Sequence, residues 1–565
     1  MSTTRVLETT GSGDAGKPLA LALVASHADV KPFVRKDAAD TYVVPVQVPA
    51  LKKRKSGADG LDTRRKEPEE LAEREVKEKI ERERRAKRIE ESKNIVLTED
   101  ESLPQAKKTK IRHLEHLRGQ RVFVSGWVHR LHSHEDSMVI VLRDGTGYLQ
   151  CALSGKVAQT YAALTLTLES SVQLHGVLQV VPESKTAPGG HELSVDFWKV
   201  LGAAPGGDDA LADKLNEKCD QSVLADMRHL VLRGETASAV LKLRAALLAS
   251  ARTSLVSHNL LEVTPQCLLQ TQVEGGATHF ELDYYGQRAF LTRSSQFYLE
   301  TCLPSLGDVF CVQESFRVEQ AHTRRHLSEY THLEAELAFI TFDDLMSHIE
   351  TIICETIDRL LANPATAALI KQLSPDFTAP SRPFLRMPYI DAIQWLNAHG
   401  IQREAADADG NAILDAAGNT EMVAHAVGDD IGEAAERRMT DILGVPVFLH
   451  SFPAAMKAFY MKRLPAQDGA AHVLTESCDL LVPGVGEIAG GSMRMTGQEE
   501  LLAALETQES VDVSSCYWFT DQRKYGTCEH GGYGVGVERF LAWVANRHTV
   551  RECSLYPRWP GRVTP

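Results

Sequence analysis

One stretch of this chain, FRVEQAHTRRHLSEYTHLEAELAF at Phe316–Phe339, predicts two strands joined by a basic loop. Successive side chains of a strand point to opposite faces, so Arg317 and Glu319 share one face of the first strand. Glu334 and Glu336 repeat that spacing on the second strand. The loop adds three basic side chains, namely Arg324, Arg325 and His326. A charged face of this kind suits a ligand with phosphates at one end and an ammonium or amide at the other, although a solvated hairpin is the alternative.

A second segment, TESCDLLVPGVGEIAGGSMR at Thr475–Arg494, carries two carboxylates around a Pro-Gly turn. Asp479 and Glu487 are of the type that binds Mg²⁺, which takes one or two protein carboxylates together with substrate phosphates. The glycines after Glu487 allow the backbone to approach a ligand closely. Turns of this composition are common, so this segment is a weak signal by itself.

A third segment, GGYGVGVERF at Gly531–Phe540, predicts a glycine-rich strand that runs into an apolar helix. Arg539 stands at the junction with apolar neighbours. A surface arginine is the simple interpretation, but the setting favours a planar cation stacked on a flat ligand.

Together these segments resemble the ordered motifs of class II aminoacyl-tRNA synthetases. FRVE–loop–RRHLSEY resembles motif 2, GVGVERF resembles motif 3, and NLLEVTP at Asn259–Pro265 resembles motif 1. From about Ser102 to Pro565 the chain is similar to the eukaryotic cytosolic asparaginyl-tRNA synthetases. The resemblance implies an α+β fold, with a class II antiparallel catalytic sheet flanked by helices, an N-terminal OB-fold β-barrel and an N-terminal extension.

The resemblance implies ATP-dependent ligation of L-asparagine to tRNA(Asn) through an asparaginyl-adenylate. Arg317 and Arg539 are then the catalytic residues, with Arg317 on the α-phosphate. Glu319 is expected to contact the adenine amino group, and Tyr330 and Arg539 to sandwich the adenine ring. The remaining phosphate contacts are expected from Arg325 or His326 at the γ-phosphate, and from Asp479 and Glu487 through Mg²⁺.

The resemblance also implies an amino-acid pocket. Glu274, in a mobile VEGGA loop, is expected to bind the ammonium, Gln296 to line the pocket and Arg494 to hold the side-chain carbonyl oxygen. Glu334 can accept a hydrogen bond from an amide and repel a carboxylate, and such a site rejects an analogue by roughly 10⁴–10⁵. Aspartyl enzymes carry a lysine where this chain has Leu299.

Three other functions remain as alternatives. An aspartyl-tRNA synthetase is disfavoured by Leu299. An ATP-dependent asparagine-forming ligase on the same core would not need an OB-like domain. A non-catalytic synthetase paralogue would be expected to lose motif residues, which this chain retains.

Short alternating strands between about Arg121 and Leu201 predict an OB-fold, which presents a strand face to single-stranded nucleic acid. The resemblance makes it the anticodon-binding domain, with Gln150 reading the middle anticodon uridine. Where the family has a stacking aromatic side chain, this chain has Val139. Stacking contributes about 1–3 kcal/mol per base, so another side chain must supply it or the contact is lost.

The 565 residues predict several domains. We expect an unassigned module over 1–50, a charged helical linker or tRNA-touching arm over 51–112, the OB-fold over 113–203, a hinge over 204–235 and the catalytic domain over 236–565. Within the last of these, residues 405–425 read as a surface loop inserted relative to the family.

Composition limits the kinds of binding partner and the cellular compartment that we expect. A net charge of −14 disfavours indiscriminate nucleic-acid binding, so tRNA contacts must use local basic patches. Ten cysteines without a CxxC pair favour reduced thiols in the cytoplasm. No apolar run is long enough to span a membrane. Motif 1 implies a homodimer.

Overall fold

The computed structural model describes two compact units, residues 1–206 and 207–565. Side chains are described from residue 76 to residue 564, except at 77–78, 81, 135, 183, 216–218, 271–278, 319–322, 408–412, 416–417, 466–471 and 508–513. Before residue 76 only three strands are described, as backbone. The boundary between the units falls inside the segment 204–235 that the sequence predicts as a hinge.

The first unit begins with a three-stranded antiparallel sheet in the order β1-β3-β2. Its strands are β1 (Thr4–Thr9), β2 (Arg35–Lys36) and β3 (Tyr42–Gln47). Residues 82–92 are helical, with an exposed Lys87–Glu91 pair at 3.8 Å. Exposed pairs of this kind stabilise a helix only slightly. The start of the predicted arm carries four basic residues in a row, Lys52, Lys53, Arg54 and Lys55, which lie outside the described residues.

The rest of the first unit is a closed barrel of five strands, which confirms the OB-fold. The strands follow the order β5-β6-β7-β9-β8, and a β5–β8 pairing closes the barrel. They are β5 (Arg121–Ser133), β6 (Ser137–Arg143), β7 (Tyr148–Ser154), β8 (Ser171–Val180) and β9 (His191–Gly202), with β4 (Lys107–Lys108) parallel to β5. On β6 and β7 every second side chain is buried, as strict alternation of apolar residues requires.

The second unit is built on an eight-stranded sheet in the order β10-β14-β15-β22-β21-β20-β19-β16, which confirms the class II catalytic fold. The two edge strands pair in parallel and all the others are antiparallel. The strands are β10 (Leu261–Glu262), β14 (Val309–Phe316), β15 (Glu329–Ala338), β16 (Leu385–Pro388), β19 (Val447–His450), β20 (Ser477–Val482), β21 (Gly486–Met493) and β22 (His530–Gly536).

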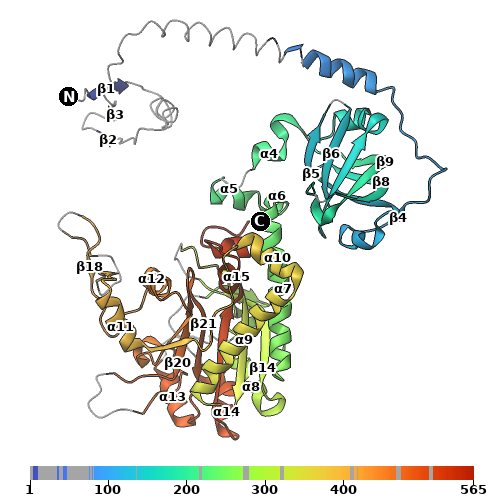
Figure 1. Ribbon diagram of the computed structural model, residues 1–565. Helices are drawn as coiled ribbons and strands as arrows, with labels where there is room; N and C mark the ends of the chain where they lie inside the picture. Colours follow the sequence, from blue (N-terminus) through green and yellow to red (C-terminus); the bar gives the residue numbers. More distant parts are fainter. Residues whose placement is uncertain are drawn as a thin grey trace. The chain divides into compact units, whose positions relative to one another are not determined.

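Helices cover one face of this sheet. In Figure 1, α7 (Glu235–Ser257) and α9 (Phe342–Ala362) run side by side, with α10 (Pro364–Leu373) and α15 (Val537–Val544) nearby. Buried side chains from these helices and from alternate positions of β15 form the largest hydrophobic core. Thr341 and Asp344 form a capping box that fixes the start of α9. No helix of the described chain is long and apolar enough to cross a membrane.

The remaining elements surround the opposite face and the ends of the sheet. A small sheet has the order β11-β13-β12, and β17 pairs with β18. These elements are β11 (Leu268–Leu269), β12 (Glu281–Tyr284), β13 (Gln287–Leu291), β17 (Arg403–Glu404), β18 (Met422–Val423), α4 (Leu211–Lys214), α5 (Gln221–Asp226), α6 (Arg228–Val231), α8 (Gln296–Leu306), α11 (Tyr389–Ala398), α12 (Glu433–Leu443), α13 (Gln498–Glu506) and α14 (Tyr517–Lys524). The short helix α3 (Tyr161–Leu164) belongs to the first unit, where Ala163 packs into the barrel core.

The segment 405–425 differs from the simple surface loop expected from its composition. Strands β17 and β18 pair at its ends, and an isolated bridge joins Leu414 to Thr420. Ala405 and His425 are buried, and the backbone NH of His425 donates to the amide oxygen of Asn397 at 2.9 Å. The ends of the segment therefore belong to the packed domain.

Candidate active site

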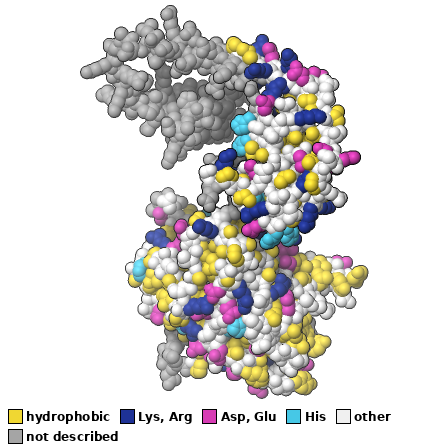
Figure 2. Space-filling view, turned by 45° about the vertical axis from the view of Figure 1, so that its right-hand side comes forward, with side chains coloured by type: hydrophobic (Ala, Val, Ile, Leu, Met, Phe, Trp, Pro, Cys, Tyr) yellow, Lys and Arg dark blue, Asp and Glu magenta, His cyan; other side chains and the backbone are white. Residues whose placement is uncertain are grey.

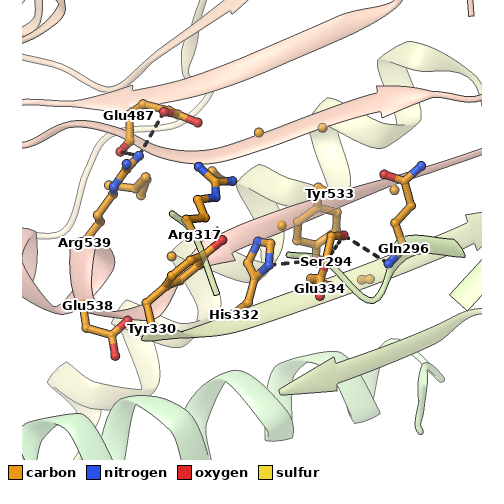
Figure 3. A pocket seen from close by; sticks show the side chains of 18 of the residues that line it. Ser294, Gln296, Arg317, Tyr330, His332, Glu334, Glu487, Tyr533, Glu538 and Arg539 are labelled. Atoms are coloured by element: carbon orange, nitrogen blue, oxygen red, sulfur yellow. Dashed lines mark hydrogen bonds and ion pairs between the residues drawn. The ribbon is translucent and has the colours of Figure 1, made fainter. Parts of the chain in front are cut away.

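A cavity of about 230 Å³ lies on the face of the sheet opposite α7 and α9. Its walls come from β15, β21 and β22, from the start of α8 and from the loop that follows β14. Alternate residues of β15 line it, namely Tyr330, His332, Glu334 and Glu336. The charged second strand that the sequence predicts is therefore one wall of this pocket (Figure 3).

The glycines of β22 make room for these polar side chains. In the strand register His332 lies opposite Gly536, Glu334 opposite Gly534 and Glu336 opposite Gly532. A Cβ atom at Gly532 would overlap the carboxylate of Glu336, and one at Gly534 would overlap the ring of His332. The glycine-rich motif thus accommodates the neighbouring strand of the protein itself, in addition to any ligand.

Arg317 lies at one end of the pocket, and the prediction that it sits on a strand needs correction. Strand β14 ends at Phe316, and Arg317 follows it, with its backbone NH donating to the carbonyl of Ser328 at 2.9 Å. The guanidinium lies 5.5 Å from the ring centroid of Tyr330, a cation–π distance. Glu319 lies outside the described residues.

Arg539, at the start of α15, reaches the same end of the pocket. Its Nη1 donates to Glu487 at 2.9 Å to Oε2 and 3.1 Å to the backbone carbonyl (Figure 3). Arg325 and His326 also line the cavity. Arg325 donates to Glu436 of α12 at 2.5 Å, a partner 111 residues away that no local pattern predicts.

The two predicted metal ligands converge. A Cβ atom built on Gly490 would lie 3.2 Å from a carboxylate oxygen of Asp479 and 3.5 Å from one of Glu487. A β-bulge between β20 and β21 shifts the register at Ile488, directly after Glu487, and bulges re-aim side chains in this way. Burial raises the pKa of Glu487, but Arg539 and Arg325 outweigh it and lower the pKa to about 2. Asp479 accepts a hydrogen bond from Lys457 at 2.6 Å.

Gln296 and Glu334 lie at the other end of the pocket. Gln296 begins α8 and lines the cavity together with Leu299. Glu334 is 3% exposed and accepts from the Ser294 hydroxyl at 2.5 Å and the Ser295 backbone NH at 2.8 Å. Both of its oxygens therefore have a protein donor. Glu274 lies outside the described residues.

Arg494 is held in place by the carboxylate of Glu336, which the sequence suggested as a second-layer partner of an arginine. Its Nε and Nη2 each donate to Glu336 at 2.9 Å, and its Nη1 donates to Ser492 at 2.6 Å. Burial lowers the pKa of Arg494, but Glu336 more than compensates and raises it. Arg494 lines the cavity with a fixed guanidinium plane.

The proposed anticodon reader lies on the outer face of the barrel. The amide of Gln150 donates to Glu192 of the neighbouring strand β9 at 2.9 Å. Val139 faces Ala152 on one side and His132 on the other. His132 is exposed, and directly opposite residues of an antiparallel pair lie on the same face.

The sheet, the glycine strand and the arginines at the pocket define a class II aminoacyl-tRNA synthetase, and family comparisons agree. Residues 220–560 match the model of tRNA synthetases class II (D, K and N). Residues 122–201 match an OB-fold nucleic acid binding domain, and residues 17–104 match an asparaginyl-tRNA synthetase N-terminal domain.

Individual relatives narrow the family further. The chain is 51% identical to the cytoplasmic asparagine–tRNA ligase of Saccharomyces cerevisiae, over 99% of this chain and 98% of the relative. The human cytoplasmic asparagine–tRNA ligase is 50% identical over 87% and 86% of the two chains. A solved Entamoeba histolytica asparaginyl-tRNA synthetase, in complex with asparaginyl-adenylate, has a TM-score of 0.72 and 37% identity, covering 82% of this chain and all of that one. The chain belongs to the asparaginyl-tRNA synthetases.

Proposed function

We propose that this chain joins L-asparagine to tRNA(Asn) in two steps, through an asparaginyl-adenylate. The observation that carries the proposal is one cavity with Arg317, Tyr330 and Arg539 at one end and Gln296 and Arg494 at the other. The asparagine carboxylate attacks the α-phosphate of ATP and pyrophosphate leaves. The terminal ribose hydroxyl of the tRNA then attacks the adenylate carbonyl and AMP leaves. Substrates supply both nucleophiles, so the protein positions them and stabilises charge.

The phosphate end provides the cations that the first step needs. Arg317 is assigned to the α-phosphate, where negative charge develops during the attack. Tyr330 and Arg539 are assigned to the two faces of the adenine ring, and Glu319 to its amino group. Arg325 or His326 is assigned to the γ-phosphate. The contact between Arg317 and Tyr330 supports this arrangement, because it holds the guanidinium beside the proposed adenine site.

Mg²⁺ fits the two carboxylates at Gly490. Asp479 and Glu487 supply hard oxygen ligands that approach one point from two strands, and Mg²⁺ prefers such ligands together with phosphate oxygens. The depressed pKa of Glu487 keeps that carboxylate ionised. When bound, the metal would neutralise phosphate charge, while Lys457 holds Asp479 in place.

The amino-acid end selects an amide. Arg494 is assigned to the side-chain carbonyl oxygen, since Glu336 and Ser492 occupy only three of its five N–H groups among the described residues. Glu334 is assigned to the side-chain NH₂, and Glu274 and Gln296 to the ammonium end. Leu299 leaves the pocket without the lysine of aspartyl enzymes.

The barrel is proposed to read the anticodon. Gln150 is assigned to the middle uridine, with its amide oriented by Glu192. The imidazole of His132 beside Val139 offers a flat ring for a stacked base. On the face drawn in Figure 2, basic side chains are interspersed with acidic ones, so affinity for RNA depends on such local contacts.

Two further features complete the proposal. A homodimer is proposed because the segment from α7 to β10 corresponds to motif 1. In the family that this chain resembles, motif 1 forms the dimer interface. A cytoplasmic location is proposed because the matched relatives are named cytoplasmic.

The proposal is tested by ATP–pyrophosphate exchange with asparagine or aspartate, followed by charging of tRNA(Asn). Exchange that depends on asparagine, and transfer to tRNA(Asn), are the expected results. Exchange with aspartate alone would overturn the substrate, and no exchange with either would favour a non-catalytic paralogue. Removal of Mg²⁺ with a chelator is expected to abolish exchange.

A further inference from the structure

A buried charge network lies directly behind the amino-acid end of the pocket. Glu300, on the first turns of α8, is 2% exposed and accepts from Arg523 at 2.5 Å and from His530 at 3.1 Å. Its other oxygen accepts from the amide of Gln296 at 2.9 Å. Arg494 lies 3.9 Å from it. Glu300 itself does not line the cavity, so its influence on a substrate must pass through these neighbours.

The ring of His530 is a cation in this network. Its Nδ1 faces the carbonyl of Cys528 at 2.7 Å, and its Nε2 faces Glu300. Both partners only accept hydrogen bonds, so both ring nitrogens must carry a proton. Burial lowers the pKa of His530, while Glu300 outweighs that effect and raises it. Glu300 therefore faces two cations, His530 and Arg523.

The carboxylate also fixes the side chain of Gln296. An ionised carboxylate accepts but cannot donate, so the NH₂ group of Gln296 must face Glu300. The carbonyl oxygen of that amide is left on the side of the cavity that Gln296 lines. An oxygen at this place suits a substrate ammonium, whereas the flipped amide would present N–H groups to it.

Glu300, Glu336 and His530 also have ligand atoms within 4.8 Å of one another, as a metal site would require. The carboxylates, however, already accept from arginine donors: Glu300 from Arg523 and Glu336 from Arg494. Two guanidinium groups and an imidazolium would repel a bound cation. The cluster is therefore an ion-pair network.

We propose that Glu300 is a positioning residue for asparagine selection, which orients Gln296 toward the substrate ammonium and keeps Arg523 and His530 from attracting a substrate carboxylate. The proposal rests on the proposed function and deepens it. Without this anion, two buried cations behind Arg494 would favour aspartate, whose side chain carries the charge that asparagine lacks.

The test measures KM and kcat for asparagine and aspartate in pyrophosphate exchange. Glu300→Gln is expected to raise KM for asparagine about tenfold or more and to narrow the preference for asparagine over aspartate by at least about tenfold, with a smaller change in kcat. Glu300→Asp keeps the charge but shortens the reach, so it should weaken asparagine binding and still reject aspartate. Glu169→Gln, which breaks the part-buried ion pair with Arg143 in the barrel, is the control and should change neither value.

Two outcomes overturn the proposal. One is Glu300→Gln with the wild-type KM and the wild-type preference. The other is a wild-type KM for asparagine in the double variant Glu300→Gln/Arg523→Gln. This variant removes both members of the buried ion pair, so it can be measured even if the single variant does not fold. If Glu300→Gln also folds, the double variant should reject aspartate better than Glu300→Gln does. Wild-type exchange with asparagine in the same assay tests the proposed function separately.

Discussion

The two faces of strand β15 differ in chemistry although both are buried. Leu333, Ala335 and Leu337 belong to the core beneath α7 and α9. His332, Glu334 and Glu336 alternate with them and are also at most 9% exposed, yet they are polar and each has a partner. One strand thus serves stability on one face and chemistry on the other. Substitutions on the two faces should therefore separate folding from catalysis.

The largest effect on stability is expected from the helix-covered face. Leu333→Ala removes buried methyl groups and leaves a cavity, which costs about 2–5 kcal/mol in the free energy of unfolding. The folded fraction of Leu333→Ala should keep the wild-type KM for asparagine. Chemical denaturation and exchange kinetics measure the two effects. A loss of asparagine affinity without destabilisation would break the distinction between the faces.

The pocket face should show the opposite behaviour. Arg317→Ala removes the cation assigned to the α-phosphate, so kcat for pyrophosphate exchange should fall by about 10²–10³. The denaturation midpoint should change little, because Arg317 lies at the pocket beyond the end of β14. Arg317→Lys is the matched control and should recover only part of the rate, since lysine cannot reproduce the planar fork. Wild-type kcat in Arg317→Ala would exclude the assigned role.

The pH dependence of stability should also report on the helix-covered face. His348 of α9 packs near Tyr533, and burial, followed by the charge of His258, lowers its pKa to about 4. An unfolded histidine titrates near 6.5, so this group contributes stability above that pH, which is lost as the pH falls toward 4. The loss in the free energy of unfolding amounts to about 3 kcal/mol. His348→Phe should flatten the stability profile between pH 6.5 and 4, and an unchanged slope would show that other groups control it.

The smallest effect is expected on tRNA affinity, from a substitution in the barrel of the first unit. His132→Ala should weaken tRNA binding by about 1 kcal/mol, roughly fivefold, through the loss of one stacked base. His132→Phe should retain binding, and adenylate formation should be normal in both variants. Filter binding with tRNA(Asn) measures the change. Equal affinity of the alanine and phenylalanine variants would place the stacking contact elsewhere.

Sequence patterns predicted the sheet and most of the pocket because strand alternation and ordered motifs are local signals. The alternating pattern predicted a strand that extends through Arg317, but β14 ends one residue earlier, at Phe316. Glu300 was missed since an isolated acid in an apolar helical run reads as a solvent-facing position. The partnership of Arg325 with Glu436 depends on tertiary packing between distant segments. The pairing of His132 with Val139 depends on the bulge in β5, which no composition reveals.

The bare backbone of β22 restricts how this protein could acquire a new substrate. Because side chains from β15 already fill the space above Gly532 and Gly534, a mutation at either glycine introduces a collision before it can introduce a new contact. Changes in amino-acid preference are therefore expected at positions outside these two glycines, such as Glu334 on β15, Leu299 on α8 or Arg494 after β21. Laboratory evolution of the pocket should accordingly leave Gly532 and Gly534 untouched.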